Sequence, residues 1–331
     1  MRHWYRRGAP AWLLWPVSLA FGFLVFFRKL LYRLRILKSS HPGIPVVVVG
    51  NLTAGGSGKT PLVLWIAQEL RARGFLPAIV SRGYGGAAEA PREATIASDP
   101  AEVGDEPMLL ARRSGCPVWV GPDRVEAIAR LRAQHPDANV LVLDDGLQHY
   151  ALARDIEIAV VDGRGFGNGF LLPAGPLREP PRRLRSVSAV IAHEIDKSQL
   201  LPHAGAKPVF AMHLEGDEAH RATDSRDRRS IRTFAGERVH AVAGIGDPAR
   251  FFRYLQARGL QPIEHPFADH HPFAAADLEF GDALPVLMTE KDAVKCKRFA
   301  KPHHWVLPVS AAPEPAFGEW LRRELERTRR P

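Results

Sequence analysis

Residues suited to phosphate binding stand together near the start of the chain. The segment Gly55-Gly56-Ser57-Gly58-Lys59-Thr60 follows the β-branched run Val46–Val49 and leads into apolar residues at helical spacing. Glycines let backbone N–H groups approach phosphate oxygens, and the N-terminus of the following helix favours negative charge. We expect Lys59 to reach the β- and γ-phosphates of a nucleoside triphosphate and Thr60 to bind Mg²⁺. The residues predicted to bind the nucleotide are Thr53, Ala54, Gly55, Gly56, Ser57, Gly58, Lys59 and Thr60.

A second apolar run ends in two acidic residues. Val140–Leu143 leads directly into Asp144, which Asp145 and Gly146 follow. A P-loop enzyme uses a carboxylate at the end of a strand to hold Mg²⁺ beside the phosphates. The predicted Mg²⁺ ligands are Thr60, Asp144 and Gln148. His149 lies on the same turn, where a structural role remains an open alternative.

Short apolar segments alternate with helical patterns around these motifs. Strands are expected at 46–49, 76–81, 117–120, 140–143 and 156–161, and helices at 62–73, 105–113 and 123–134. This alternation predicts a P-loop NTPase-type α/β fold with a doubly wound, mostly parallel sheet. Ligands of such sheets lie beyond the carboxyl ends of the strands.

A second, smaller α/β domain is expected in the C-terminal part. Its strands are predicted at 239–244, 285–289 and 305–309, the last being the final strand, and its helices at 248–258 and 317–327. The expected domains are an N-terminal helix at 1–38, a P-loop kinase core at 39–185 and the smaller domain at 186–331.

The net charge of +9 belongs to the N-terminal segment. Residues 1–38 contain eight lysines and arginines and no acidic residue, and the rest is close to neutral, so we predict no nucleic-acid partner. Residues 10–27 carry no charge and would span roughly 27 Å as a helix, just short of a hydrocarbon core. Basic flanks favour a membrane-associated helix that lies in one leaflet. A full span and a buried core helix remain alternatives.

The motifs, in chain order, resemble one family. They are Gly50–Pro61, Ser81–Gly85, Gly104–Pro107, Gly121–Arg124, Leu143–His149, Leu171–Glu179, Asp269-His270 and Thr289–Asp292. Behind a basic, apolar N-terminus, this set resembles the tetraacyldisaccharide 4′-kinases, the lipid A 4′-kinases of Gram-negative inner membranes. Thr53 stands where the general P-loop motif has glycine, and this departure is a feature of the family.

The resemblance implies phosphoryl transfer from ATP, with Mg²⁺, to the 4′-hydroxyl of a tetraacylated diglucosamine 1-phosphate, the lipid A disaccharide precursor. It places the active site in the cleft between the two domains and the N-terminal helix on the cytoplasmic face of the inner membrane. No obligate protein partner is expected.

The resemblance also assigns roles to residues. Asp105 is expected to accept the proton of the sugar hydroxyl, with His270 as its partner and Lys59 as the third catalytic residue. An Asp–His pair can share a proton near neutral pH. From the sequence alone, Asp105 is equally well a helix cap and His270 a surface loop residue. Further candidates, whose arginines would bind phosphate groups or form structural ion pairs, are Asp145, His149, Arg82, Arg124, Arg178 and Glu179.

The alternative function is a membrane-associated P-loop GTPase or ATPase regulator. Asp162-Gly163-Arg164-Gly165 follows a predicted strand and resembles an Asp-x-x-Gly switch. The chain lacks a guanine-recognition motif, because Thr289–Asp292 has the wrong spacing. A non-enzymatic scaffold is disfavoured because Lys59, Thr60 and Asp144 are all present.

Overall fold

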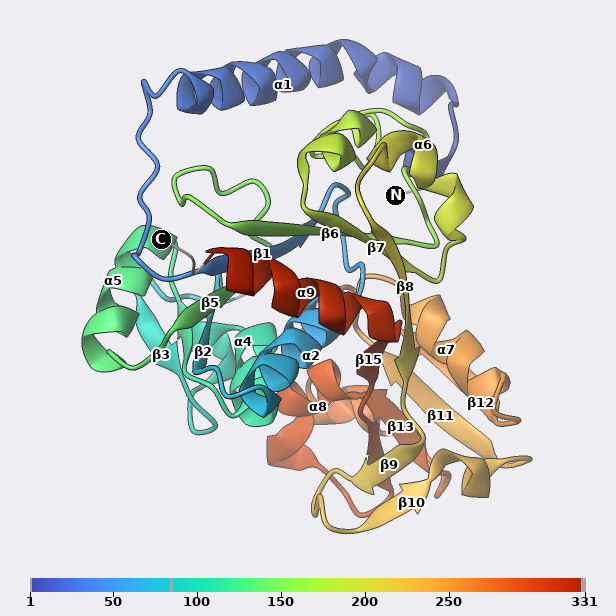
Figure 1. The fold of residues 1–331 in the computed structure, drawn as a ribbon. Helices are drawn as coiled ribbons and strands as arrows, with labels where there is room; N and C mark the ends of the chain where they lie inside the picture. Colours follow the sequence, from blue (N-terminus) through green and yellow to red (C-terminus); the bar gives the residue numbers. More distant parts are fainter. Residues whose placement is uncertain (1, 84–85, 329–331) are drawn as a thin grey trace.

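A nine-stranded sheet forms the larger unit of the protein, seen here in a computed structural model that describes residues 2–83 and 86–328 (Figure 1). Its strand order is β15-β8-β7-β6-β1-β5-β2-β4-β3. The strands are β1 (Val46–Asn51), β2 (Pro77–Ser81), β3 (Arg92–Ala94), β4 (Val118–Val120), β5 (Val140–Leu143), β6 (Ile156–Asp162), β7 (Ala189–His193), β8 (Val209–Glu215) and β15 (Ser310–Pro313). Strands β8 to β4 pair in parallel, and β15 and β3 are antiparallel edges. The predicted doubly wound sheet is therefore present, with the P-loop strand β1 in its interior.

Helices cover both faces of this sheet. One face packs against α2 (Lys59–Ala72), α4 (Asp105–Ser114) and α9 (Pro315–Thr328), and the other against α5 (Arg124–Gln134), η2 (Pro181–Ser186) and α6 (Leu201–Ala204). Because both faces are buried, β1 reads as an unbroken valine run instead of an alternating pattern. Short helices α3 (Pro100–Val103) and η3 (Lys197–Gln199) lie in the connections.

A six-stranded sheet forms the smaller unit. Its order is β10-β9-β14-β13-β11-β12, and β14, β13, β11 and β12 are parallel. The strands are β9 (Glu218–Arg221), β10 (Arg228–Ser230), β11 (Arg238–Ala243), β12 (Gln261–Pro266), β13 (Val286–Thr289) and β14 (His304–Leu307). Its helices are α7 (Pro248–Gln256) and α8 (Glu290–Cys296), with the short helices η4 (Ile231–Phe234), η5 (Ala275–Leu278) and η6 (Lys297–Phe299). Helices α7 and α8 cover opposite faces of the sheet.

The end of the chain returns to the larger unit. Strand β15 pairs with β8, and Phe317 of α9 packs against Trp65 and Phe210, with ring centroids 5.4 Å apart in both pairs. The predictions that residues 305–309 form the last strand and that 317–327 close the smaller domain are therefore wrong. The last strand belongs to the larger sheet, and the last helix packs against it.

Helix α1 (Ala9–Arg33) lies along the outside of the larger unit, after the short helix η1 (Arg2–Tyr5) (Figure 1). It is long and apolar enough to cross a membrane, but only 11% of its apolar window is buried. The buried polar residue Ser18 fixes it, since its hydroxyl donates to the Leu171 carbonyl at 2.8 Å and accepts from the Ala174 N–H at 3.0 Å. The helix is therefore docked on the loop that precedes Glu179 and is not a core helix.

Candidate active site

The P-loop has the expected strand–loop–helix form. Gly58 precedes α2 with φ +85°, a left-handed conformation that favours glycine, and Lys59 is the first residue of the helix. The buried His193, at the end of β7, lies directly beneath the loop, and its Nδ1 is 2.9 Å from the Ser57 carbonyl. Sequence analysis did not identify His193, which has no motif of its own.

Asn51 orients the lysine of the P-loop. It is fully buried as the last residue of β1, and its Oδ1 accepts from Lys59 Nζ at 3.2 Å. Its Nδ2 donates to the Gly55 carbonyl at 3.3 Å. Asn51 lies within the Gly50–Pro61 motif but is not among the predicted site residues, although its place at the carboxyl end of the P-loop strand is a signal for a role in the site.

Asp144 has the properties of a metal ligand. It follows β5, the neighbour of β1, is 1% exposed, and its Oδ1 is buried with no hydrogen-bond partner among the described residues. Burial, followed by the negative charge of Glu106, raises the pKa of Asp144 to about 7. A buried carboxylate oxygen facing no donor is unfavourable unless a cation or proton joins it. Asp144 and Thr60, the second residue of α2, therefore fit a Mg²⁺ ion.

Gln148 is held by its neighbours. Its Nε2 donates to the Asn51 carbonyl and to Glu179 Oε1, both at 3.1 Å. Its Oε1 accepts from Arg178 at 3.4 Å. The oxygen that would bind a metal thus faces an arginine, and a role as ligand stays a prediction.

Asp145 is surrounded by cations. Arg178 donates to its two carboxylate oxygens at 3.0 and 2.8 Å, and Lys59 Nζ lies 3.5 Å away. Although burial opposes the charge, Lys59 and Arg178 hold the pKa of Asp145 well below its usual range. Buried Arg124 donates to the Asp145 backbone carbonyl at 3.0 Å. Asp144 and Asp145 therefore differ in ionisation although they are adjacent.

The structure brings Asp105 and His270 together from the two units. Asp105 is the first residue of α4 and is 4% exposed, and His270 lies in the loop after β12 with φ +61°. His270 Nδ1 is 3.1 Å from both carboxylate oxygens of Asp105. The contact across 165 positions is thus present, and the roles given to the two residues stay predictions.

The surroundings of this pair lower the pKa of Asp105 and raise that of His270. Burial opposes the charge of Asp105, but the hydrogen bond from His270 and the charges of Lys291 and Lys295 lower the pKa of the carboxyl. In turn, the hydrogen bond to Asp105 raises the pKa of His270. Lys295 Nζ lies 3.5 Å from Asp105. Sequence analysis gave Lys291 no role and did not single out Lys295.

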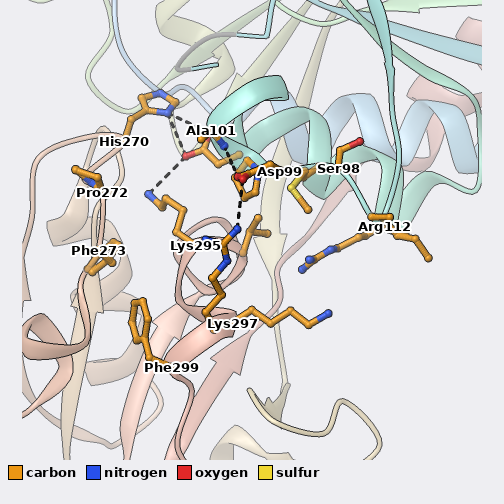
Figure 2. A pocket seen from close by; sticks show the side chains of 17 residues that line it. Ser98, Asp99, Ala101, Arg112, His270, Pro272, Phe273, Lys295, Lys297 and Phe299 are labelled. Atoms are coloured by element: carbon orange, nitrogen blue, oxygen red, sulfur yellow. Dashed lines mark hydrogen bonds and ion pairs between the residues drawn. The ribbon is translucent and has the colours of Figure 1, made fainter. Parts of the chain in front are cut away.

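Helix α4 separates two cavities. Glu106, Leu109 and Arg113 face a cavity of about 190 Å³ that the P-loop and residues of α7 and α8 also line. Asp105, Met108 and Arg112 face a cavity of about 880 Å³, which Figure 2 shows with His270, Lys295 and Lys297 around it. The two adjacent residues Asp105 and Glu106 therefore line different cavities.

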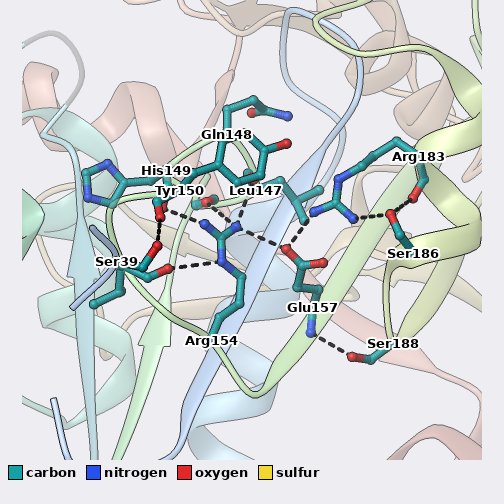
Figure 3. A network of polar contacts seen from close by, with 12 residues as sticks. Ser39, Leu147, Gln148, His149, Tyr150, Arg154, Glu157, Arg183, Ser186 and Ser188 are labelled. Carbon is teal, nitrogen blue, oxygen red and sulfur yellow. Dashed lines mark hydrogen bonds and ion pairs between the residues drawn. The ribbon is translucent and has the colours of Figure 1, made fainter. Parts of the chain in front are cut away.

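A buried polar network links the Gln148 turn to α1. Glu179 is 1% exposed, accepts from the Tyr150 hydroxyl at 2.6 Å and lies 3.5 Å from Lys29 of α1. Next to it, Arg183 and Arg154 both bind Glu157, as Figure 3 shows. Glu179 is thus part of a structural network that reaches Gln148 on one side and the N-terminal helix on the other.

The side chains of His149 and Arg82 have no part in the contacts described so far. Burial and the charges of Arg124 and Arg154 lower the pKa of His149 to about 4, so its ring is neutral at pH 7. The His149 backbone carbonyl accepts from Arg154 at 2.6 Å. Arg82 is exposed, and its neighbours Tyr84 and Gly85 in the predicted motif lie outside the described residues.

Asp162 is engaged by two arginines. Arg164 donates to both of its carboxylate oxygens and also to the Gly56 carbonyl in the P-loop. Arg250 of α7 lies 3.1 Å from the same carboxylate. Asp162 therefore ties the P-loop to the smaller unit, which disfavours a free switch carboxylate in a regulatory GTPase.

These features define a class of protein. The P-loop opens a helix against a parallel sheet. The neighbouring strand ends at Asp144, whose buried Oδ1 has no hydrogen-bond partner in the described part of the chain, and an acid–histidine pair bridges the two units. Such an arrangement is that of a P-loop phosphotransferase with an acceptor hydroxyl.

Comparison with known proteins identifies the family. The family model described as tetraacyldisaccharide-1-P 4′-kinase matches residues 10–326, and the chain belongs to this family. It is 50% identical to the tetraacyldisaccharide 4′-kinase of Azoarcus sp., over 99% of this chain and 96% of that protein. It is 52% identical to that of Aromatoleum aromaticum, over 93% and 91%. The crystal structure of LpxK from Aquifex aeolicus in complex with ATP aligns with a TM-score of 0.80 and 27% identity, over 95% of this chain and 99% of that one.

Proposed function

We propose that this chain transfers the γ-phosphoryl group of ATP to the 4′-hydroxyl of tetraacyldisaccharide 1-phosphate, a step of lipid A biosynthesis. The observation that carries the proposal is the Asp105–His270 pair, since it supplies a buried base at the first turn of the helix whose next residue, Glu106, lines the P-loop cavity. The family to which the chain belongs supports the acceptor. ATP and a divalent metal are the cofactors of this reaction.

Each residue has a part in the proposed transfer. Lys59 and the amides of the P-loop would hold the β- and γ-phosphates, and Thr60 and Asp144 would hold Mg²⁺, which would neutralise charge on the phosphates. Asp105 accepts the proton of the acceptor hydroxyl, because its carboxylate stays ionised and is oriented by His270. Arg124 holds the backbone carbonyl of Asp145, and Arg178 holds its carboxylate.

We further propose that the enzyme works at the cytoplasmic face of the inner membrane. Helix α1 leaves large apolar side chains exposed, among them Leu13, Phe23 and Leu24, and it has basic residues at both ends. An apolar face with basic flanks is suited to an anionic bilayer surface. The ion pair between Lys29 and Glu179 connects this helix to the Gln148 turn, so acyl chains in the bilayer would end near the site.

The test is a transfer assay. Full-length protein in detergent micelles is given labelled ATP, Mg²⁺ and tetraacyldisaccharide 1-phosphate, and label is expected in the lipid. Asp105→Asn should lower kcat by about 10² or more while the KM for ATP changes little, because the base acts on the acceptor. Hydrolysis of GTP without lipid labelling would refute the kinase and favour the regulator. Equal losses in kcat and ATP affinity would instead give Asp105 a folding role.

A further inference from the structure

The ammonium group of Lys291 stands among the groups that surround the Asp105–His270 pair. Lys291 is the second residue of α8, and its side chain is 14% exposed. Its Nζ lies 3.0 Å from Glu106 Oε1, 3.2 Å from Asp269 Oδ1 and 3.3 Å from His270 Nε2. Two carboxylates and one ring nitrogen thus meet a cation with three N–H donors.

The chemistry of lysine decides the direction of the contact with histidine. An ammonium group has donors only, so within this contact Nε2 must be the acceptor and cannot carry a proton. The proton of a neutral imidazole then sits on Nδ1, which faces both carboxylate oxygens of Asp105 at 3.1 Å. Glu106, Asp105 and Asp269 together raise the pKa of Lys291, so the group stays charged at every pH of interest.

We propose that Lys291 is a positioning residue that fixes His270 in its Nδ1–H tautomer and leaves Asp105 as the group that receives the hydroxyl proton. This assignment rests on the proposed kinase function. With Nε2 occupied by Lys291, the ring cannot act as the base through that nitrogen, and with Nδ1 protonated it can only donate to Asp105. The acceptor proton therefore goes to the carboxylate as the O–H bond breaks, the new O–P bond forms, and the bond from the γ-phosphorus to the bridging oxygen of ATP breaks, with ADP as the leaving group.

Charged groups reach this centre from each element around it. Asp105 and Glu106 come from α4, Asp269 from the loop of His270, and Lys291 and Lys295 from α8. Asp269 Oδ1 is 3.7 Å from His270 Nε2, longer than a hydrogen bond, so Lys291 holds the closer position. The positive charge of Lys291 opposes a second proton on His270, while Asp105 favours it.

The same lysine joins the two units. It belongs to the smaller unit, as does His270, whereas Glu106 and Asp105 follow one another in α4 of the larger unit. The Lys291–Glu106 ion pair and the His270–Asp105 hydrogen bond are therefore neighbouring contacts across the same interface between the two units. Glu106 also raises the pKa of Asp144, so the lysine balances a charge that acts on the metal site.

The first test measures the wild-type chain and uses a variant only to assign its signal. In protein labelled with ¹⁵N at histidine, two-bond ¹H–¹⁵N spectra distinguish the two neutral tautomers, and His270→Gln identifies the signal. The spectra are recorded at a pH above the pKa of His270, where the ring is neutral, and we expect the His270 signal of the wild-type chain to show Nδ1–H and an unprotonated Nε2. A ring protonated on Nε2 alone would overturn the assignment whether or not the protein has kinase activity.

The second test separates positioning from folding. Lys291→Met should lower kcat by about tenfold to a hundredfold, part of what a general base supplies, with little change in the KM for ATP. Because the opposing cation is gone, His270 should keep its second proton to higher pH, and the acidic limb of kcat should move to higher pH. Lys291→Arg should retain the wild-type limb. The matched control is Lys301→Met, which removes an exposed lysine of the same unit that pairs with Glu279 at 2.8 Å.

The outcomes distinguish this inference from the proposed function. A wild-type chain without lipid kinase activity refutes the function, while the tautomer remains measurable by NMR. An active wild-type chain with an unchanged acidic limb in Lys291→Met overturns the positioning role. Lys291→Met could instead lower both kcat and the free energy of unfolding in urea, without changing the acidic limb of the kcat profile or the tautomer of His270. That result would show that Lys291 only holds the two units together.

Discussion

At the scale of single residues, position in the fold decides the chemistry of similar side chains. Asp144 and Asp145 are neighbours, yet burial next to Glu106 raises the pKa of the first and Lys59 and Arg178 lower that of the second. The first carboxylate is short of a positive partner and the second has several. An added cation should therefore bind at Asp144 and displace its proton.

Binding of Mg²⁺ and ATP should release a proton. Since burial raises the pKa of Asp144 to about 7, the carboxyl of the free protein is mostly protonated below that pH and mostly ionised above it, and a bound metal requires the carboxylate. Metal affinity should rise as the pH increases through about 7. Calorimetry in buffers of different ionisation enthalpy measures the release. The control, Asp144→Asn, should abolish this component; a release unaffected by that change would contradict the assignment.

Gly58→Ala should disable the P-loop. The residue has φ +85°, which costs an alanine roughly 1 kcal/mol or more. A β-carbon would also come within 2.5 Å of His193 Nδ1, so the loop or the ring must move. We expect lower stability in urea and a large loss of ATP affinity. Gly43→Ala is the matched control, because its φ is +78° with no atom within 4 Å of the added carbon, and it should keep ATP binding.

Residues within continuous motifs could be predicted from the sequence. Lys59 belongs to a glycine-rich loop, and Asp144 is an acidic residue at the end of an apolar strand. Both patterns indicate a chemical role directly. Asn51 and His193 could not be predicted in this way, because their role comes from packing under the loop, which has no local pattern. The contact between Asp105 and His270 was inferred from the family resemblance alone.

At the scale of elements, helix α1 exposes many of its large apolar side chains. Phe23→Asp with Leu24→Asp should reduce binding to anionic vesicles by about tenfold or more, since each buried side chain of this size contributes roughly 1.5–3 kcal/mol. Both residues are 64% exposed, so thermal stability should hardly change. The control, Leu76→Asp, alters an exposed leucine outside α1 and should bind as the wild type does. Unchanged vesicle binding by the double variant would contradict membrane docking through this face.

Long or strongly apolar elements were predictable, and short ones were not. The P-loop strand and helices α4, α5 and α7 lie within a few residues of their expected bounds. Strand β15, Ser310–Pro313, has small residues and a proline in place of a β-branched run, so its sequence gives no strand signal. The second unit was recognisable from its strand–helix alternation, but sheet membership of the last segment depends on long-range pairing.

At the scale of the whole molecule, Arg113 joins the two units where the chain returns. From α4 it donates to Glu290 at 2.8 Å, to the Val309 carbonyl at 2.7 Å and to Ser310 Oγ at 2.8 Å. Arg113→Ala should lower the free energy of unfolding by about 2 kcal/mol, because charged hydrogen bonds are lost at a partly buried site. Urea titration measures this. Arg112→Ala changes the exposed neighbour and should cost much less; equal costs would contradict the role of Arg113.

We propose that the smaller unit, residues 216–309, is an insertion between β8 and β15 of the larger sheet. These two strands are hydrogen-bonded neighbours, although the whole second sheet lies between them in the chain. The interface between the units carries the Asp105–His270 pair, the Lys291–Glu106 pair and the Arg113 contacts. Insertion anchors the smaller unit at both ends beside α4, which suits a site assembled from two parts.

The return of β15 and α9 also sets an order of events during synthesis. Because synthesis runs from the N-terminus to the C-terminus, α1 is made long before β15, so the proposed membrane contact of this helix can form while the larger sheet still lacks its edge strand. In the inserted unit, strands β9 to β14 follow one another in the chain with no strand of the larger sheet between them. This unit can therefore fold before β15 is added to the larger sheet. The face that receives Phe317 and Leu321 then stays uncovered until α9 has been made. A chain truncated after residue 309 should therefore hold a folded insert and an N-terminal helix beside an unfinished kinase core.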